Sequence, residues 1–225
     1  MATRPNESKI RERLTRERIV EAALRIMDSE GLEAVTMRRI GRELGVEAMS
    51  LYNHVEDKEE VLDWICERVM ANFEFPRPSG DWAETCRRAA RSWRRLLQAH
   101  PDLIRLFAQG RGPVRSVESL RPMEFALQLL REAGLSDRDA VQAFHAVGAY
   151  IQGFVMMEHG SVAGGPQHAK IHQEVAAALN PDEFPAFRAV GPYFAECDLD
   201  DQFEFGLDLL IEGLLAKVRQ GDGRA

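Results

Sequence analysis

A glycine turn between two short amphipathic stretches is the feature of this sequence that most constrains its fold. Met37, Ile40 and Leu44 recur at helical spacing, which predicts a short helix with one buried face. Gly45 follows directly, and glycine readily adopts the left-handed backbone that ends a helix and turns the chain. Gly41 lies one turn earlier, where a missing side chain lets another helix cross closely. The sequence therefore predicts two short helices that cross at a tight turn.

The second of these helices is expected over residues 47–53, and its outward face suits a DNA groove. Leu51 is expected to point inward, together with the flanking Val46 and Val55. The outward positions carry small or polar side chains, namely Ala48, Met49, Ser50, Tyr52 and Asn53. Such a face suits entry into a major groove, which is about 12 Å wide. Two short helices around a turn also occur in ordinary helical domains, so the turn alone leaves both interpretations open.

A further helix is predicted to begin after Asp57. Asp57 and Glu60 form an N-cap and N3 pair, a loose version of the capping box, and an apolar helical pattern continues from Val61. Lys58 therefore lies at a helix N-terminus, where backbone N–H groups and its own charge can hold a phosphate.

The longer string around the turn resembles a known family. Residues 36–40 read TMRRI, residues 43–46 ELGV and residues 51–55 LYNHV, and they are followed by Lys58 and by Leu-Asp at 62–63. Over roughly residues 14–72 this string is similar to the N-terminal domain of the tetracycline-repressor (TetR) family of bacterial transcription regulators. More loosely, Ala-Val-Gly at 146–148 and FGLDLLIEGL at 205–214 resemble the C-terminal domain of the tetracycline-repressor subgroup.

The remaining sequence predicts helices and no convincing strand, so the expected fold class is all-α. A first amphipathic helix is expected over residues 14–30, and Phe75 to Gly80 is the clearest break. Later helices are expected at 82–100, 103–108, 116–133, 136–158, 167–179, 183–190 and 199–219. We expect a flexible basic tail (1–13), a three-helix helix-turn-helix DNA-binding domain (14–75), and a larger helical ligand-binding and dimerisation domain (81–225).

The resemblance implies roles for the residues around the turn. Arg38 is expected on a guanine edge, the commonest specific contact of an arginine. Ala48, Met49 and Asn53 would face bases or thymine methyl groups, with Ser50 on the same outward face. Tyr52, His54 and Lys58 would contact the phosphate backbone. Met37 replaces a hydroxyl residue common at its position in the family, which removes one expected phosphate contact, and Met49 leaves the operator sequence open.

The resemblance also implies a ligand cavity in the second domain. The apolar candidates are Trp93, Leu97, Phe107, Phe125, Phe144, Ile151 and Phe154, and the polar ones are His100, His145 and Gln152. Ordinary core packing is the alternative for each of them. Phe107 and Ala149 stand where tetracycline-binding members have a magnesium-binding and a drug-contacting histidine. We therefore expect a small apolar effector, with no magnesium and no cofactor.

A dimer is the further implication. In the family, the final helix and the long helix before it pair with their copies, which corresponds here to residues 139–158 and 200–218. Phe203, Leu207, Leu210 and Leu214 form an apolar face on the final helix, and Gly206 and Gly213 would allow a helix to pack closely. A monomer that uses both faces for its own core is the alternative. Two reading helices about 34–36 Å apart would require a palindromic site.

Composition agrees with a regulator and argues against one other class of nucleic-acid-binding protein. The formal charge of −7 and the pI of about 5.5 argue against a protein coated in nucleic acid. Six of the basic residues lie within residues 1–18, against three acidic ones, so this end either contacts phosphates or is a solvated, frayed terminus. The scattered Cys66, Cys86 and Cys197 indicate reduced thiols of a cytosolic protein.

The expected localisation is the cytoplasm. The chain opens without a leader-like pattern, and its most apolar stretch, residues 143–157, is too short to cross a bilayer, so no membrane partner is expected. His168 and His172, with His159 nearby, lack a third ligand at a fixed spacing, and no metal site is predicted.

The function expected is that of a dimeric repressor that binds a palindromic operator in double-stranded DNA and is released by a small molecule. An activator, or a DNA-binding protein that answers to a partner protein, is the nearer alternative. An enzyme or carrier is the remote one, because the sequence shows no nucleophile paired with a base, no phosphate loop and no carboxylate constellation.

Overall fold

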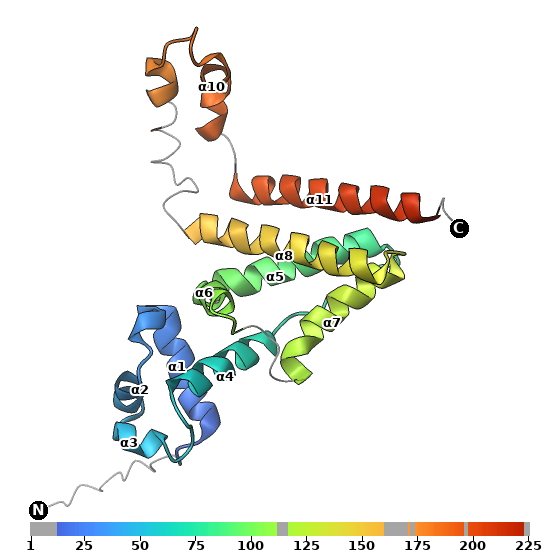
Figure 1. Ribbon diagram of the computed structural model, residues 1–225. Helices are drawn as coiled ribbons and strands as arrows, with labels where there is room; N and C mark the ends of the chain where they lie inside the picture. Colours follow the sequence, from blue (N-terminus) through green and yellow to red (C-terminus); the bar gives the residue numbers. More distant parts are fainter. Residues whose placement is uncertain (1–12, 112–116, 160–170, 172–173, 196–197, 223–225) are drawn as a thin grey trace, which may run out of the picture. The chain divides into compact units, whose positions relative to one another are not determined.

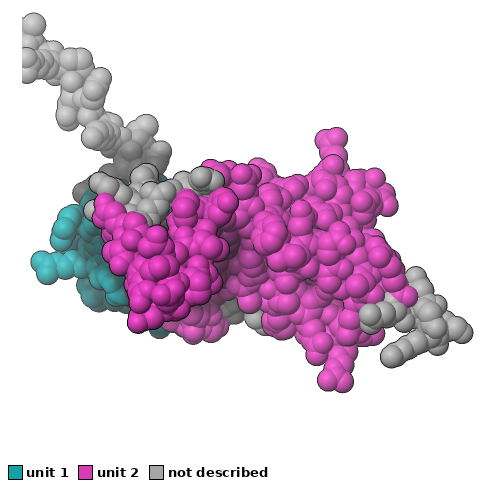
Figure 2. All heavy atoms as spheres, turned by 90° about the horizontal axis from the view of Figure 1, so that it is seen from above, with its two compact units in different colours: residues 1–68 teal, residues 69–225 magenta. Residues whose placement is uncertain are grey.

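The computed structural model describes residues 13–111, 117–159, 171, 174–195 and 198–222. All regular structure in these ranges is helical, which confirms the predicted all-α class. The chain divides into two compact units, residues 1–68 and 69–225, which are coloured separately in Figure 2. The division falls inside helix α4 (Lys58–Met70). None of the described helices has a segment apolar and long enough to cross a lipid bilayer.

Unit 1 is built from four α-helices around a small aliphatic core (Figure 1). Helix α1 (Arg16–Glu30) is followed by the 3₁₀ turn η1 (Leu32–Ala34), and then by α2 (Met37–Leu44), α3 (Ala48–Leu51) and α4. Each helix contributes side chains that are almost completely buried, among them Ile19, Ile26, Ile40, Leu51 and Ile65. Packing of these residues fixes the short helices, which are too short to be stable in isolation.

Local sequence signals set the ends of α1. Thr15 is its N-cap, and the Thr15 hydroxyl oxygen accepts a hydrogen bond from the Arg18 amide at 3.4 Å. Gly31, at φ 87°, ends the helix one residue after the expected range. Ala22 and Ile26 of this helix are fully buried, whereas Leu24 is only half-buried.

Unit 2 contains the longer helices (Figure 1). They are α5 (Trp82–Ala99), α6 (Asp102–Ala108), α7 (Val117–Glu132), α8 (Asp137–His159), α10 (Pro185–Val190) with the 3₁₀ turn η2 (Gly191–Ala195), and α11 (Leu199–Asp222). Helix α5 packs against α7, α8 and α11, and α8 also packs against α7 and α11. Leu97, Leu103, Leu106, Phe203, Leu207 and Ile211 are fully buried and form the centre of this unit.

Breaks in unit 2 follow the sequence signals closely. Residues 73–79 have no regular structure, and Asp81 then caps α5 by accepting hydrogen bonds from the amides of Ala83 (2.9 Å) and Glu84 (3.4 Å). Ser136 accepts the Asp139 amide at 3.2 Å and so caps α8, at the residue where the predicted helix begins. The helix expected at 167–179 lies partly outside the described residues, and residues 174–178 of it are helical.

The contact between α8 and α11 explains one of the two glycines, Gly206 and Gly213, that the sequence analysis singled out in the final helix. A Cβ atom on Gly206 would overlap the phenol of Tyr150, a residue of α8 in the same chain. The Tyr150 hydroxyl donates a hydrogen bond to the Phe203 carbonyl oxygen at 2.8 Å. Gly206 therefore serves packing within the chain, whereas Gly213 is exposed with no atom near its Cβ position. The buried stripe of α11 runs through Ile211, while Leu210 is only half-buried.

Candidate nucleic-acid interface and ligand site

The crossing of α2 and α3 depends on both glycines that the sequence singled out. Gly45 adopts the left-handed conformation (φ 67°, ψ 34°), and the next amide, that of Val46, bonds to the Gly41 carbonyl oxygen at 2.9 Å. A Cβ atom on Gly41 would lie 2.9 Å from the Val46 oxygen and 3.2 Å from the Ala48 nitrogen. Both neighbours are backbone atoms, so only glycine permits this approach of α3.

Two adjacent arginines of α2 have different surroundings. Arg39 forms an ion pair with Glu30 at 2.6 Å and with Glu43 at 2.8 Å, so it ties α2 to the end of α1. The hydrogen bond from Arg39 holds the pKa of Glu30 below its ordinary value, and the bonds to Glu30 and Glu43 raise the pKa of Arg39. Arg38 is exposed, and no carboxylate of the described chain pairs with it. The Arg39 guanidinium is therefore engaged by carboxylates of its own chain, whereas that of Arg38 is available for an external partner.

Helix α3 is shorter than the expected 47–53. It covers Ala48–Leu51, and the chain then turns because the Leu51 carbonyl oxygen accepts both the His54 amide (2.9 Å) and the Val55 amide (3.1 Å). Met49 is 75% exposed, and Tyr52, Asn53 and His54 are also exposed. Ala48 and Ser50 are half-buried instead of fully outward. For Ala48 the reason is its backbone contact with Gly41.

The start of α4 has the predicted cap. Asp57 Oδ1 accepts the Glu60 amide at 2.8 Å, and Glu60 Oε2 accepts the Glu56 amide at 2.6 Å. The return bond thus reaches one residue earlier than in a regular capping box. Lys58 is the first residue of α4 and is half-buried. The eight predicted DNA-contacting residues all belong to α2, α3, the turn after α3 and the start of α4, within unit 1.

Several of the ten predicted ligand residues take part in aromatic contacts within unit 2. One group is an aromatic chain from α6 to α7: Phe107 stacks on Trp93 (6.1 Å between centroids), Trp93 contacts Phe73 (6.0 Å), and Phe75 contacts both Phe73 (4.9 Å) and Phe125 (5.5 Å). Sequence reasoning overlooked Phe73 and Phe75. Their position beside the Pro-rich break was the available signal, since that break carries aromatic residues next to the second domain.

A second group surrounds a buried ion pair. Phe154 contacts the rings of Tyr150 and Phe203, and the Arg94 guanidinium lies 4.4 Å from the Phe203 centroid. Arg94 pairs with Glu158, which is likewise buried, and its Nη2 lies 2.7 Å from Asp200 Oδ1. No pattern in the sequence predicts this pair, because arginine and glutamate are almost always exposed.

The other predicted ligand residues lie on α5, at its C-terminal end, and on α8. Leu97 and Ile151 are core residues, and Phe144 packs on the small cluster of Leu130, Leu135, Ala140 and Ala143. His145 is exposed beside Phe144, and His100 and Gln152 are half-buried. A ligand cavity lined by these residues therefore remains a prediction.

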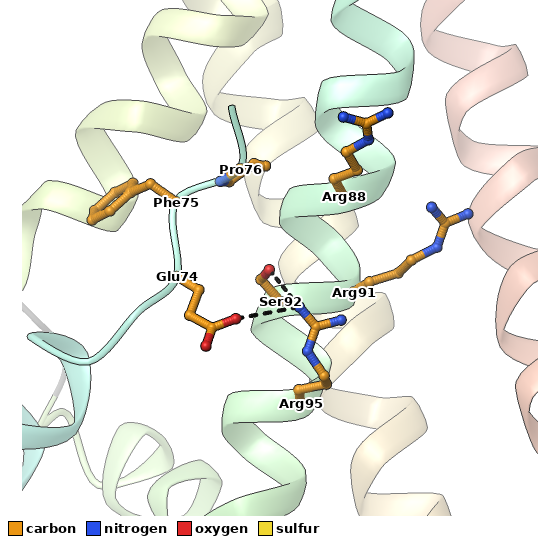
Figure 3. Close-up of a pocket in the computed structure, with 7 residues that line it drawn as sticks. All are labelled: Glu74, Phe75, Pro76, Arg88, Arg91, Ser92 and Arg95. Carbon is orange, nitrogen blue, oxygen red and sulfur yellow. Dashed lines mark hydrogen bonds and ion pairs between the residues drawn. The ribbon is translucent and has the colours of Figure 1, made fainter. Parts of the chain in front are cut away.

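A pocket of about 270 Å³ lies elsewhere in unit 2, between α5 and the segment before it (Figure 3). Its lining consists of Glu74, Phe75, Pro76, Arg88, Arg91, Ser92 and Arg95. None of the ten predicted residues belongs to it. The available signal in the sequence was the run of arginines on one helix, whereas the predicted set consisted mainly of apolar residues.

Metal ligands do not gather anywhere in the described part of the chain, where no cluster of three or more His, Cys, Asp or Glu side chains could hold an ion. His159 Nδ1 lies 3.0 Å from the Val155 carbonyl oxygen. His168 and His172 lie outside the described residues.

Comparisons with known proteins agree with this architecture. Residues 19–65 match the family model "Bacterial regulatory proteins, tetR family", and residues 75–218 match "Tetracyclin repressor-like, C-terminal domain". The HTH-type transcriptional repressor DrrR1 of Streptomyces coeruleorubidus is 33% identical, with 94% of this chain and 81% of that protein covered.

Solved structures are similar over almost the whole chain. Apo ActR from Streptomyces coelicolor superposes with a TM-score of 0.81 at 34% identity, covering 92% of this chain and 97% of that one. ActR in complex with actinorhodin gives 0.79 at 34% identity over 92% and 99%. BioQ, known from Mycobacterium smegmatis, gives 0.62 at 28% identity in its complex with its double-stranded DNA operator, over 91% and 99%. The chain belongs to the TetR family: it is a DNA-binding transcription regulator of the repressor type, and not an enzyme.

Proposed function

We propose that this chain is a dimeric repressor that binds a palindromic operator and releases it when a small effector binds to unit 2. The observation that carries the proposal is the exposed reading surface of unit 1. Arg38 is available there, Arg39 is held by two carboxylates, and Met49, Tyr52 and Asn53 are exposed on and after α3. The named relatives, which include repressors and a protein bound to its operator, support this assignment. Such a regulator would act in the cytoplasm, where the chromosome lies.

Exposed apolar side chains on α8 and α11 support a dimer. Phe205 and Leu209 on α11 are 69% and 61% exposed, and Val141 and Met156 on α8 are also exposed. Side chains of this size seldom gather on a free surface without a partner. Pairing of α8 and α11 with their copies would cover them and would present two reading helices to one duplex.

An apolar effector is supported by the aromatic chain through Trp93 and Phe107. These rings come from three helices and one irregular segment, so a planar apolar ligand inserted among them would change how those elements pack. The complex of ActR with actinorhodin is an example of a relative with a bound small molecule. Coupling of this kind is reciprocal, because DNA must weaken the ligand by the factor by which the ligand weakens DNA.

The test of the proposal is selection of genomic fragments by the purified chain at about 0.15 M salt, with random competitor DNA in excess. We expect recovery of a short inverted repeat. Recovery of a single half-site would contradict the dimeric arrangement, and recovery of nothing above the competitor would contradict sequence-specific binding. A promoter fused to the recovered site should be less active with the regulator than without it, whereas an activator would give the opposite result.

The effector is tested separately with an apolar compound library. A true effector should raise the melting temperature of the chain and should release the recovered fragment at the same concentration. Compounds that stabilise the protein without releasing DNA would contradict the coupling.

A further inference from the structure

The pocket beside α5 has a chemistry that the predicted effector site lacks. Arg88, Arg91, Ser92 and Arg95 share one face of α5, because residues three, four and seven apart lie on the same side of a helix. Glu74, Phe75 and Pro76 form the facing wall (Figure 3). Among the three arginines of this lining, Arg95 turns its guanidinium toward the Glu74 carboxylate, whereas Arg88 and Arg91 point away from it (Figure 3). We refer to these seven residues as the arginine groove.

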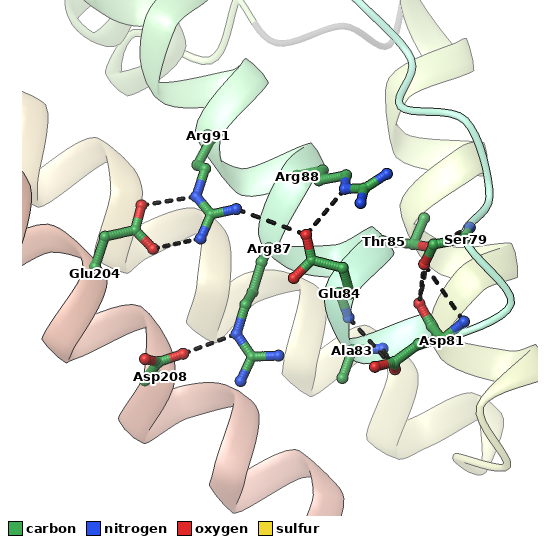
Figure 4. A network of polar contacts seen from close by, with 10 residues as sticks. All are labelled: Ser79, Asp81, Ala83, Glu84, Thr85, Arg87, Arg88, Arg91, Glu204 and Asp208. Carbon is green, nitrogen blue, oxygen red and sulfur yellow. Dashed lines mark hydrogen bonds and ion pairs between the residues drawn. The ribbon is translucent and has the colours of Figure 1, made fainter.

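The three arginines differ in the hydrogen bonds that hold their guanidinium groups. Figure 4 shows those of Arg88 and Arg91. Arg91 forms two hydrogen bonds of 2.7 Å with the two carboxylate oxygens of Glu204 on α11, so its charge is already matched. Arg88 donates one hydrogen bond, from Nε to Glu84 Oε1 at 2.9 Å. A guanidinium has five donors, so most of those on Arg88 remain for another acceptor.

Arg95 is the least firmly held of the three. Its Nη2 donates to Ser92 Oγ at 2.9 Å, but lies 3.7 Å from Glu74 Oε2, beyond hydrogen-bond distance. The Arg95 side chain is 60% exposed and that of Glu74 82% exposed. Such an ion pair is weak because water screens it. The carboxylate of a bound ligand can therefore replace that of Glu74 at Arg95.

The lining of the arginine groove offers apolar contacts as well as positive charge. The aliphatic parts of the arginine side chains, together with Pro76 and Phe75, give apolar walls below the charged tips. Phe75 extends this wall toward α7, where its ring contacts Phe125. A guanidinium binds a carboxylate with two parallel hydrogen bonds and also stacks on aromatic rings. The volume is slightly smaller than that of typical drug-sized pockets, which begin at about 300 Å³.

We propose that the arginine groove binds a small aromatic carboxylate. Its carboxylate pairs with Arg95 in place of Glu74, and its ring lies between the Arg88 guanidinium and Pro76. Arg91, held by Glu204, keeps that face of α5 in place. Binding of the acid is independent of the proposed repressor function; only a role for the acid as effector rests on that function.

The experiment is calorimetric titration of the full chain, without DNA, with benzoate, 1-naphthoate and 2-naphthoate. Amides of the same rings and sodium acetate serve as matched probes. We expect at least one of the aromatic acids to bind, its amide to bind about tenfold more weakly or worse, and acetate to give no signal. Failure of all three acids, or equal affinity for acid and amide, would overturn the proposal. Saturation by acetate would indicate a general anion site and would overturn the aromatic part.

Variants locate the site through changes of opposite sign. Arg95→Gln should weaken the acid about tenfold, whereas Glu74→Gln should tighten it severalfold by removing the competing carboxylate. Arg131→Gln is the matched control, since this exposed arginine pairs with Asp137 and does not line the groove. Circular dichroism of each variant checks the fold. Unchanged affinity in both groove variants would place the acid elsewhere. Since operator selection uses no acid, failure of either proposal is seen independently of the other.

Discussion

Neighbouring residues on one helix can have unrelated tasks, and Arg38 and Arg39 of α2 are such a pair. Arg39 contacts Glu30 and Glu43 and so fixes α2 on α1. Arg38 projects from the same turn without a carboxylate partner in the described residues. A charged side chain that is not engaged in the fold is the one that can read a base edge.

Replacement of Arg38 by alanine should cost about 1–3 kcal/mol of binding to the operator and should relax the preference at one base pair. Lys58→Ala should instead weaken operator and random DNA alike, because a phosphate contact carries no sequence information. Fluorescence anisotropy with both DNAs, at several salt concentrations, measures the difference. Equal losses on both DNAs for Arg38→Ala would exclude a base contact for this residue.

Two cysteines should be unreactive in the native protein. Burial raises the pKa of Cys66 to about 12 and that of Cys86 to about 11, from an ordinary value of 9.0. In a Cys197→Ser background at pH 8, a thiol reagent should therefore label neither residue until urea unfolds the chain. The neutral thiols favour the folded state below pH 9, and this contribution should disappear as the pH rises through 11 to 12. Rapid labelling of the folded protein would contradict the buried placement.

At the scale of elements, the crossing of α2 and α3 depends on one missing methyl group. Gly41→Ala places a Cβ against backbone atoms of Val46 and Ala48, which cannot rotate away. The overlap should cost about 1–3 kcal/mol of stability, although alanine gains about 1 kcal/mol over glycine inside a helix. Urea unfolding followed by circular dichroism measures the net loss.

The control for Gly41 is Gly45→Asn. No atom lies within 4 Å of the Gly45 Cβ position, and asparagine tolerates the left-handed backbone found there. This variant should lose less stability and keep operator binding. A Gly41→Ala protein that folds and binds DNA like the parent would show that the two helices cross less closely than described.

The pair between α5 and α8 should be the most sensitive polar contact of unit 2. Glu158→Ala leaves Arg94 buried against Phe154 and Phe203, and should cost about 3 kcal/mol, the lower end for breaking a buried pair, because Asp200 still faces Arg94. Arg131→Ala, which removes an exposed pair with Asp137, should cost about 0–1 kcal/mol. Equal unfolding midpoints for the two variants would argue that water reaches Arg94.

At the scale of the whole molecule, assembly should depend on the exposed faces of α8 and α11. Leu209→Glu adds a charge to the exposed apolar surface of α11 and should convert the proposed dimer to a monomer. Operator affinity should then fall strongly, because each half-site must be bound separately. Light scattering during gel filtration gives the mass in solution.

The matched control is Val117→Glu on α7, which is 71% exposed, against 61% for Leu209, but lies on neither of the two helices of the proposed dimer interface. It should remain a dimer. A Leu209→Glu protein with the mass of the parent would mean that another surface holds the copies together.

Much of unit 1 was predictable from the sequence because its signals are local. The left-handed Gly45, the close approach at Gly41 and the cap at Asp57 each depend on residues a few positions away. The length of α3 was wrong by several residues, since bonds to the Leu51 carbonyl oxygen turn the chain after one helical turn. Helix periodicity indicates a face but does not fix where the last turn tightens.

In unit 2, helix positions follow from local sequence patterns, whereas contacts between helices follow from packing. Apolar periodicity and helix-breaking residues predicted where most of its helices begin and end. Short sequence motifs indicated the family to which the chain belongs. Which helix covers which face was decided by packing: Tyr150 fills the space at Gly206, Arg94 pairs with Glu158, and Trp93 stacks on Phe107. The physical reason is that spacing along a helix reports only local neighbours, whereas contacts between distant segments depend on how all side-chain volumes fill one core.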